Sequence, residues 1–242
     1  MLPSPRPSPE GRGCLLNGIR KDFVDGVLVS TIKADFRRNR VLQGMVVWLG
    51  AVWVAAAISP FDRFDWLLEN VLVFVYAVLL VTTYRRFPFS NASYALFTVF
   101  LTLHLIGSHY TYAETPIGYS LKEIFSLSRN PYDRIVHFAY GLLLAYPLYE
   151  LLRREGRLSI SWAAFVAINL ILSSSGFYEV VEGIVAGVVS PELGNAYLGT
   201  QGDIWDAQRD MLAATVGAVL AMVITIVYAK RALGRTRSSK NK

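Results

Sequence analysis

Apolar residues recur along the chain in runs long enough to cross a bilayer. A transmembrane helix needs about 20 mostly apolar residues. Stretches of this kind are expected at about 42–59, 66–84, 93–110, 132–151, 159–179 and 210–229. Residues 180–189 are also apolar but too few to span, so we expect them to form a re-entrant or interfacial segment. The pattern predicts an all-α polytopic membrane helix bundle of about six transmembrane helices.

The flanking segments differ from the bundle, which is expected at 41–230. Residues 1–19 are rich in Pro, Ser, Gly and Arg and lack an apolar core, so we expect a disordered head. In 20–40, apolar residues such as Phe23, Val27 and Phe36 recur at helical spacing among basic residues. This favours an amphipathic juxtamembrane helix on the anionic inner leaflet, with a solvated linker as the alternative. Residues 231–242 are expected to form a basic cytoplasmic tail.

The distribution of charge predicts the orientation. If both termini are cytoplasmic, only a few of the 24 Lys and Arg residues lie on the extracytoplasmic side of the membrane. These outer residues are Arg63, Lys122, Arg129, Arg134 and Arg209. We therefore expect an N-in/C-in, multi-pass protein of the bacterial inner (plasma) membrane.

Composition narrows the class of partner. Apolar residues make up 53% of the chain, charged residues only 17%, and the net charge is +6. A basic protein could bind nucleic acid, but here the basic residues lie between apolar runs. We therefore expect the protein to contact membrane lipids and not nucleic acid. The single cysteine, Cys14, excludes an intrachain disulfide and a cysteine-based metal motif.

Histidines and carboxylates gather near the predicted outer surface. Charge inside a bilayer costs several kcal/mol, so such groups usually face a cavity or a partner. His104 and His109 lie toward the end of the third span, and Asp133 and His137 share one face at the start of the fourth. Further acids come from the fifth span and from the start of the last. They are Glu179, Glu182, Asp203, Asp206 and Asp210.

These groups suit three kinds of chemistry. Imidazole and carboxylate bind Zn²⁺, Mn²⁺ or Fe²⁺, and His104, His109, Asp133 and His137 are the candidate ligands of such a divalent metal. The five acids from the last two spans are the candidate catalytic residues, as general acids and bases or as a proton relay. Two structural roles compete with these. Asp133, Asp203 and Asp206 could complement helix dipoles, and the histidines could hydrogen-bond neighbouring helices.

The connection between the last two spans has a further role. Residues 182–210 carry five acids and helix-breaking residues such as Pro191 and Gly194. We predict that this segment folds back over the outer mouth of the bundle as a cap. Asp203 and Asp206 would then lie over His109 and His137, the Asn195, Thr200 and Gln201 side chains would satisfy the irregular backbone, and Arg129 would stay accessible.

Three strings of the chain carry a family resemblance: HLIGSHYTYAE at 104–114, DRIVHFAYGLLLAYP at 133–147 and GTQGDIWDAQRD at 199–210. They resemble the YjdF-like family of bacterial inner-membrane proteins over about residues 40–230. The resemblance implies the same topology and leaves the activity open. A weaker likeness is to VanZ-like proteins, linked to teicoplanin resistance, in which Asp133, His137, Glu179, Asp206 and Asp210 would match. The chain departs from that pattern at Ala214, where those proteins usually have Asn.

The sequence thus supports three hypotheses. The preferred one is a His/carboxylate site on the extracytoplasmic side, metal-dependent and acting on a lipid, a small molecule or an envelope component. The second is a small proton-linked transporter or permeability protein, and the third a non-catalytic membrane assembly protein. The oligomeric state is left open.

Overall fold

The computed structural model describes residues 19–24, 27–32, 36–189, 194, 197–198 and 200–240. Six of its helices are long and apolar enough to cross a membrane, which confirms the predicted bundle. They are α1 (Arg40–Ala57), α2 (Arg63–Thr83), α3 (Asn91–His109), α5 (Tyr132–Arg154), α6 (Ile160–Val188) and α8 (Asp206–Lys240). A short helix, α4 (Pro116–Ile124), lies between α3 and α5.

The segment before α1 differs from the predicted amphipathic helix at 20–40. It contains two antiparallel strands, β1 (Ile19–Val24) and β2 (Val27–Ile32), followed by the 3₁₀ turn η1 (Phe36–Arg38). The reason lies in composition. The two stretches are rich in β-branched and aromatic residues, which favour strands, and the sequence between them is Asp25-Gly26, a strong hairpin signal. The predicted disordered head lies outside the described residues, apart from Ile19.

The expected re-entrant segment at 180–189 is also wrong, because residues up to Val188 continue α6 without a break. Its 29 residues make a helix of about 43 Å at about 1.5 Å per residue. That length matches the bilayer with its headgroup regions. An intact helix satisfies every backbone group in lipid, and residues 160–188 contain no proline to end it. In the predicted tail, α8 likewise runs on to Lys240.

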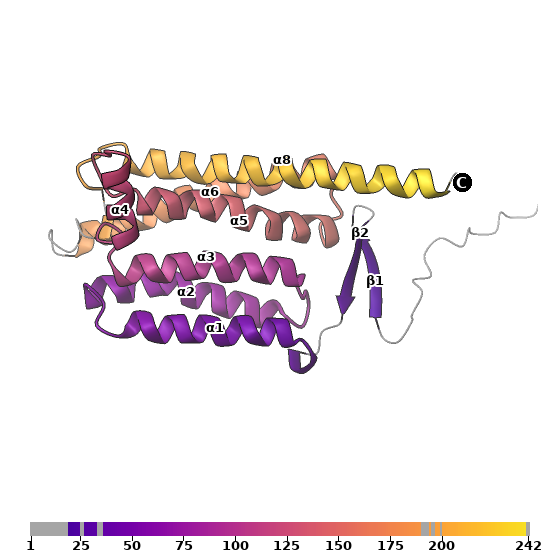
Figure 1. Ribbon diagram of the computed structural model, residues 1–242, viewed down its shortest axis with the longest axis horizontal. Helices are drawn as coiled ribbons and strands as arrows, with labels where there is room; N and C mark the ends of the chain where they lie inside the picture. The colour runs from indigo at the N-terminus through magenta and orange to yellow at the C-terminus, as the bar shows by residue number, and fades with distance from the viewer. Residues whose placement is uncertain are drawn as a thin grey trace, which may run out of the picture.

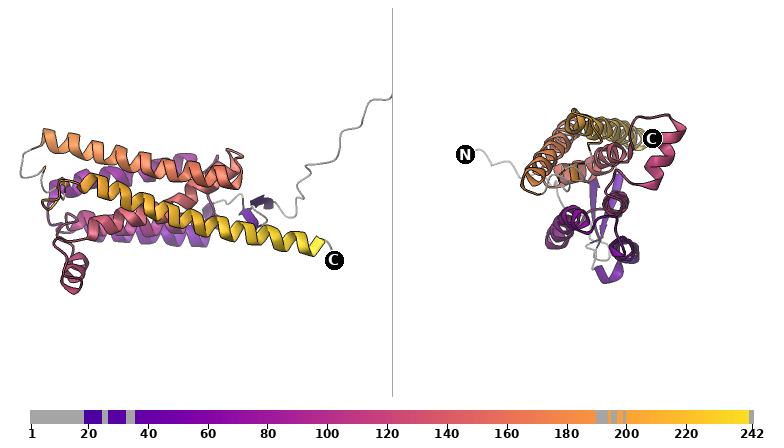
Figure 2. Two further views of the ribbon diagram at one scale, coloured as in Figure 1. Left: turned by 90° about the horizontal axis from the view of Figure 1, so that it is seen from above. Right: turned by 90° about the vertical axis from the view of Figure 1, so that its left-hand side faces the viewer.

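The spanning helices form two groups of three. Helices α1 and α2 pack on α3, while α5, α6 and α8 pack on one another, and contact between α3 and α5 joins the groups. Figures 1 and 2 show the two groups side by side along the length of the bundle. The most extensive packing is between α5 and α8. There, Gly141 and Gly217 lie so close to the facing backbone that neither position has room for a Cβ.

One end of the bundle gathers the polar residues, and we call it the site end. It is formed by the N-termini of α2, α5 and α8, the C-termini of α3 and α6, and helix α4 (Figure 1). Residues outside the bundle cap two of these helices. Asp62 accepts hydrogen bonds from Phe64 N and Asp65 N at the start of α2, and Asp203 accepts one from Trp205 N just before α8.

Candidate functional site

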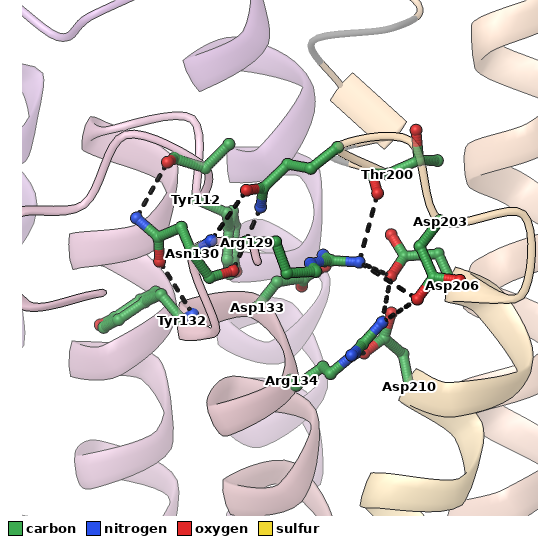
Figure 3. A network of polar contacts seen from close by, with 12 residues as sticks. Tyr112, Arg129, Asn130, Tyr132, Asp133, Arg134, Thr200, Asp203, Asp206 and Asp210 are labelled. Atoms are coloured by element: carbon green, nitrogen blue, oxygen red, sulfur yellow. Dashed lines mark hydrogen bonds and ion pairs between the residues drawn. The ribbon is translucent and has the colours of Figure 1, made fainter. Parts of the chain in front are cut away.

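Two arginines at the start of α5 hold the acids at the start of α8. The Arg129 guanidinium donates to Asp206 and, at 3.3 Å, to the carbonyl oxygen of Thr200. Arg134 pairs with Asp203 and donates to Asp206 at 3.2 Å. Figure 3 shows both guanidinium groups, Arg129 from the loop before α5 and Arg134 from its first turn, pointing into this cluster of carboxylates. Two separate helix N-termini are therefore tied together by charge-assisted hydrogen bonds.

The buried Asn130 fixes the loop before α8. Its backbone N–H donates to Gln201 Oε1 at 2.9 Å, and its carbonyl accepts from Gln201 Nε2 at 3.1 Å. Its side chain donates to Ala113 O and Thr115 O (Figure 3). Residues 200–206 thus pack on the start of α5, and the Gln201 side chain satisfies backbone groups as the predicted cap requires. Two details differ: Thr200 takes part through its carbonyl oxygen, and His109 turns toward α1 and does not meet the cap. Asn195 lies outside the described residues.

One part of the cap prediction is wrong. Arg129, expected to be accessible, is only 7% exposed, because the cap covers it and takes its hydrogen bonds. Its charge is satisfied by Asp206 rather than by water. The sequence did not reveal this pairing, since the two residues are far apart along the chain.

Next to this network, three candidate residues converge. Single ligand atoms of Asp133, His137 and Asp210 all lie within 4.8 Å of one another. His137 Nε2 is also 3.5 Å from Glu179 Oε1 and 3.6 Å from Asp133 Oδ1. Among the described residues, Glu179 Oε1 and Asp210 Oδ1 are buried and accept no hydrogen bond, although Arg134 Nε lies 3.8 Å from Asp210 Oδ1. We call Asp133, His137, Glu179 and Asp210 the acid–histidine group.

The other two histidines have different surroundings. His104 is buried, with Nε2 3.0 Å from the Glu69 carbonyl and Nδ1 2.5 Å from the Tyr112 hydroxyl. Burial, reinforced by the nearby Glu69, raises the pKa of Tyr112 well above its usual value, so this hydroxyl keeps its proton and donates to Nδ1. Nε2 then carries a hydrogen and donates to the carbonyl, which leaves neither nitrogen of His104 free for a metal. His109 turns toward α1, where Nδ1 lies 2.9 Å from Ala56 O.

Helix α2 contributes two acids that the sequence analysis missed. Glu69 is 3% exposed, accepts a hydrogen bond from the Tyr178 hydroxyl at 3.0 Å, and lies 3.9 Å from His104 Nε2. Asp65 is 1% exposed, and neither of its carboxylate oxygens has a hydrogen-bond partner among the described residues. The signal was present, because Asp62, Asp65 and Glu69 follow one helix face at the site end. In membrane spans such acids usually mark a function.

A cavity of about 430 Å³ extends from this end into the bundle. Its polar part is formed by Glu69, His104, Asp133, His137 and Glu182. Its remaining walls are mostly apolar and come from α2, α3, α5 and α6, with Tyr197 and Leu198 from the connection before α8. The candidate residues therefore lie in more than two places. His104, Asp133, His137 and Glu182 line the cavity, Asp203 and Asp206 belong to the arginine network, and His109 faces α1.

Outside the spans, the electrostatics of Asp203 follow from its partners. Burial alone would raise its pKa, but the Trp205 N–H and the guanidinium groups of Arg134 and Arg209 outweigh that effect, and the pKa lies below its usual value of 3.8. Asp203 therefore carries its charge at neutral pH and holds two cations in place.

Six apolar spans, with acids and histidines clustered at one end of the bundle, define a multi-pass integral membrane protein. The chain belongs to the family described as predicted membrane protein (DUF2238), whose model matches residues 41–231. It is 34% identical over 199 residues to the inner membrane protein YjdF of Escherichia coli strain K12, covering 81% of this chain and 93% of that relative. The YjdF-like resemblance and the inner-membrane location are thereby confirmed. The likeness to VanZ-like proteins stays a prediction. No solved structure matches the chain.

Proposed function

We propose that this protein is a metal-dependent membrane enzyme acting on a lipid or another cell-envelope component. The observation that carries the proposal is the spacing around His137 Nε2, which lies 3.5 Å from Glu179 and 3.6 Å from Asp133. These separations are too long for good hydrogen bonds. They match two ligands of a single ion, because ligands about 2.1 Å from a tetrahedral Zn²⁺ lie about 3.4 Å apart.

The chemistry of the donors supports the same proposal. The acid–histidine group offers one imidazole nitrogen and carboxylate oxygens from three helices, a set that suits Zn²⁺, Mn²⁺ or Fe²⁺. The buried oxygens of Glu179 and Asp210 that accept no hydrogen bond would gain a partner from the ion. Arg134 and the cap would hold Asp210 from outside, as supporting residues do at metal sites.

The neighbouring residues define the remaining roles. Glu182 lines the cavity beside the acid–histidine group, so it is our candidate for the general acid or base. A bound ion would polarise a phosphoryl or carbonyl oxygen of the substrate. Asp203 and Asp206, engaged by arginines, are assigned to positioning α8. His104 is left out of the metal site because both of its ring nitrogens are engaged, and His109 because its Nδ1 faces Ala56 O on α1.

The orientation is part of the proposal. Basic residues concentrate at the end opposite the site, as with Arg85, Arg86, Arg153, Arg154 and Arg157. The positive-inside rule places that end in the cytoplasm. The site end would then face the periplasm, where envelope lipids and their precursors are accessible.

Metal analysis of the purified protein tests the proposal. After loading with Zn²⁺, Mn²⁺ or Fe²⁺ and desalting, the wild type should retain an equimolar amount of one of them. His137→Ala and Asp210→Asn should lose it, and His109→Ala, whose side chain faces α1, is the matched control. A wild type that retains no metal, or a His137→Ala variant that retains as much, would falsify the metal site. Size-exclusion profiles check that each variant is folded.

The transporter hypothesis receives less support. A proton path needs titratable groups across the whole membrane. Near the opposite end, the buried carboxylate of Glu150 is already held by Ser90, Ser93 and Arg154. This arrangement ties α5 to the start of α3 and resembles a structural staple more than a relay.

A further inference from the structure

The geometry points to a lipid site, in which a phospholipid with a primary ammonium headgroup enters the cavity sideways between α2 and α6. This inference rests on the proposed function, because the phosphate of that headgroup would meet the metal bound by the acid–histidine group. Three features carry it: the separation of the two helices, the exposure of the cavity edges and the charge of the cavity lining.

Helices α2 and α6 do not pack extensively on each other. Helix α2 packs on α3, and α6 packs on α5 and α8. At the site end they are joined by the hydrogen bond from Tyr178 to Glu69. Farther into the bundle the cavity lies between them, with Leu72 and Val75 on one side and Ser174 and Phe177 on the other. This hydrogen bond therefore closes the lateral opening between α2 and α6 on the side nearest the site end.

The edges of the cavity also form the outer surface of the bundle. Val71, Val75 and Leu79 of α2 line the cavity and are 58%, 57% and 51% exposed. Phe177 of α6 lines it too and is 70% exposed. These residues lie within membrane spans, so the opening faces lipid rather than water. An acyl chain can enter there without crossing a polar surface, and about 430 Å³ falls within the usual range of ligand sites, about 300–1,000 Å³.

The lining charge selects the headgroup. Among the described residues, the cavity is lined by the carboxyl groups of Glu69, Asp133 and Glu182 and by no Lys or Arg. The guanidinium groups of Arg129 and Arg134 pair with Asp206 and Asp203, and Arg129 Nη2 also lies 3.9 Å from Asp133 Oδ2. Among the described residues, the cavity lining offers Glu69 and Glu182 no Lys or Arg. A primary ammonium has three donors and no acceptor, so it fits between these two carboxyl groups. A headgroup without an amine would bring no positive charge to Glu69 and Glu182 and would keep only the contact of its phosphate with the bound ion.

The bound lipid can be placed from these contacts. Its ammonium would lie between Glu69 and Glu182, and its phosphate beside Asp133 and His137. Its acyl chain would run along Val75 and leave through the opening. Deeper in the cavity, the Tyr140 hydroxyl and Ser174 Oγ are only 2.5 Å apart, so they satisfy each other and leave the apolar wall unbroken.

Native mass spectrometry of the detergent-solubilised full chain tests the site. The probes are phosphatidylethanolamine and phosphatidylglycerol with the same acyl chains, added at equal concentration. The wild type should favour phosphatidylethanolamine about tenfold, the worth of one charge-assisted hydrogen bond. Val75→Trp and Leu79→Trp should lower this binding at least about tenfold by filling the opening. Val81→Trp, on the same helix, exposed and outside the cavity lining, should not.

Glu182→Gln separates charge from shape. It should abolish the preference between the two lipids while the opening stays intact. Metal content measured on the same samples distinguishes the two proposals, since Val75→Trp should keep its metal. Equal binding of both lipids by the wild type, or unchanged binding by both tryptophan variants, overturns the lipid site and leaves the metal site standing. A metal-free wild type that still selects phosphatidylethanolamine through the opening overturns only the metal site.

Discussion

Gly217 of α8 lies against the carbonyl oxygen of Phe138 in α5, and a Cβ at position 217 would overlap that oxygen. Gly141 of α5 faces the carbonyl of Ala214 in the same way, so the two glycines allow a mutual close approach. This contact lies two helical turns from Asp210 and one from His137. It therefore sets the distance between the α5 and α8 members of the acid–histidine group.

Gly217→Ala should force α5 and α8 apart. We expect a loss of about 1–3 kcal/mol in the free energy of unfolding, together with weaker metal retention, because Asp210 moves away from His137. Thermal unfolding in detergent and metal analysis measure the two effects. The control is Gly183→Ala on α6, where an added Cβ meets nothing within 4 Å. A Gly217→Ala protein as stable as that control would contradict the close approach.

The buried pair of Arg129 and Asp206 should matter far more than the exposed pair of Arg209 and Asp203. Removing one partner of a buried pair leaves an uncompensated charge, so Arg129→Ala should cost about 3–5 kcal/mol. The Arg209 side chain is 53% exposed, so Arg209→Ala should lower the free energy of unfolding by less than about 1 kcal/mol. Unfolding in detergent compares them. Similar losses would mean that Arg129 is solvated and that the cap is open.

Tyr112 should act on His104 and not on the metal. Tyr112→Phe removes the hydroxyl that meets His104 Nδ1 and leaves a buried acceptor unsatisfied, at a cost of about 1–3 kcal/mol. Metal content should stay at the wild-type level, in contrast to His137→Ala. Loss of metal in Tyr112→Phe, in a protein that still elutes as a single species, would return His104 to the list of ligands.

Acid should weaken the cap through Asp203. Because the folded-state pKa of this carboxyl lies below 3.8, its ion pairs stabilise the fold above that pH. The contribution is lost as the pH falls through the lowered folded value. Asp203→Asn should therefore be less stable than the wild type near neutral pH, and the difference should shrink as the pH falls below 3.8. Unfolding temperatures of the two proteins across that pH range test this prediction. A stability difference that grows in acid would contradict it.

The orientation has a direct test in intact cells. In a chain with Cys14 replaced by Ser, a cysteine at Ile124, which is 71% exposed on α4, should react with a membrane-impermeant thiol reagent. A cysteine at Arg86, exposed at the opposite end, should react only after permeabilisation. The reverse pattern would place the site end in the cytoplasm and exclude a periplasmic substrate.

The sequence by itself determined the six spans, because runs of about 20 mostly apolar residues have the length and composition that cross a bilayer. It also placed most of the candidate histidines and carboxylates at one end of the bundle, because the position of a residue within a predicted span gives its depth in the membrane. Local signals misled at two points. The helical spacing at 20–40 coexists with strand-forming residues. Residues 180–189, too few to span the membrane alone, extend the helix of the fifth span as far as Val188.

Only the tertiary structure decided which polar residues meet. Asp133 and Asp210 belong to helices separated by all of α6, and they converge because Gly141 and Gly217 let α5 and α8 approach. His104 and His137 look alike in sequence. Tyr112 and the Glu69 carbonyl occupy the two ring nitrogens of His104, whereas Nε2 of His137 faces the carboxylates of Asp133 and Glu179 at 3.6 and 3.5 Å. Hydropathy depends on each residue alone and can be read locally. The partner of a buried charge depends on helix rotation and contact, which packing between distant segments sets.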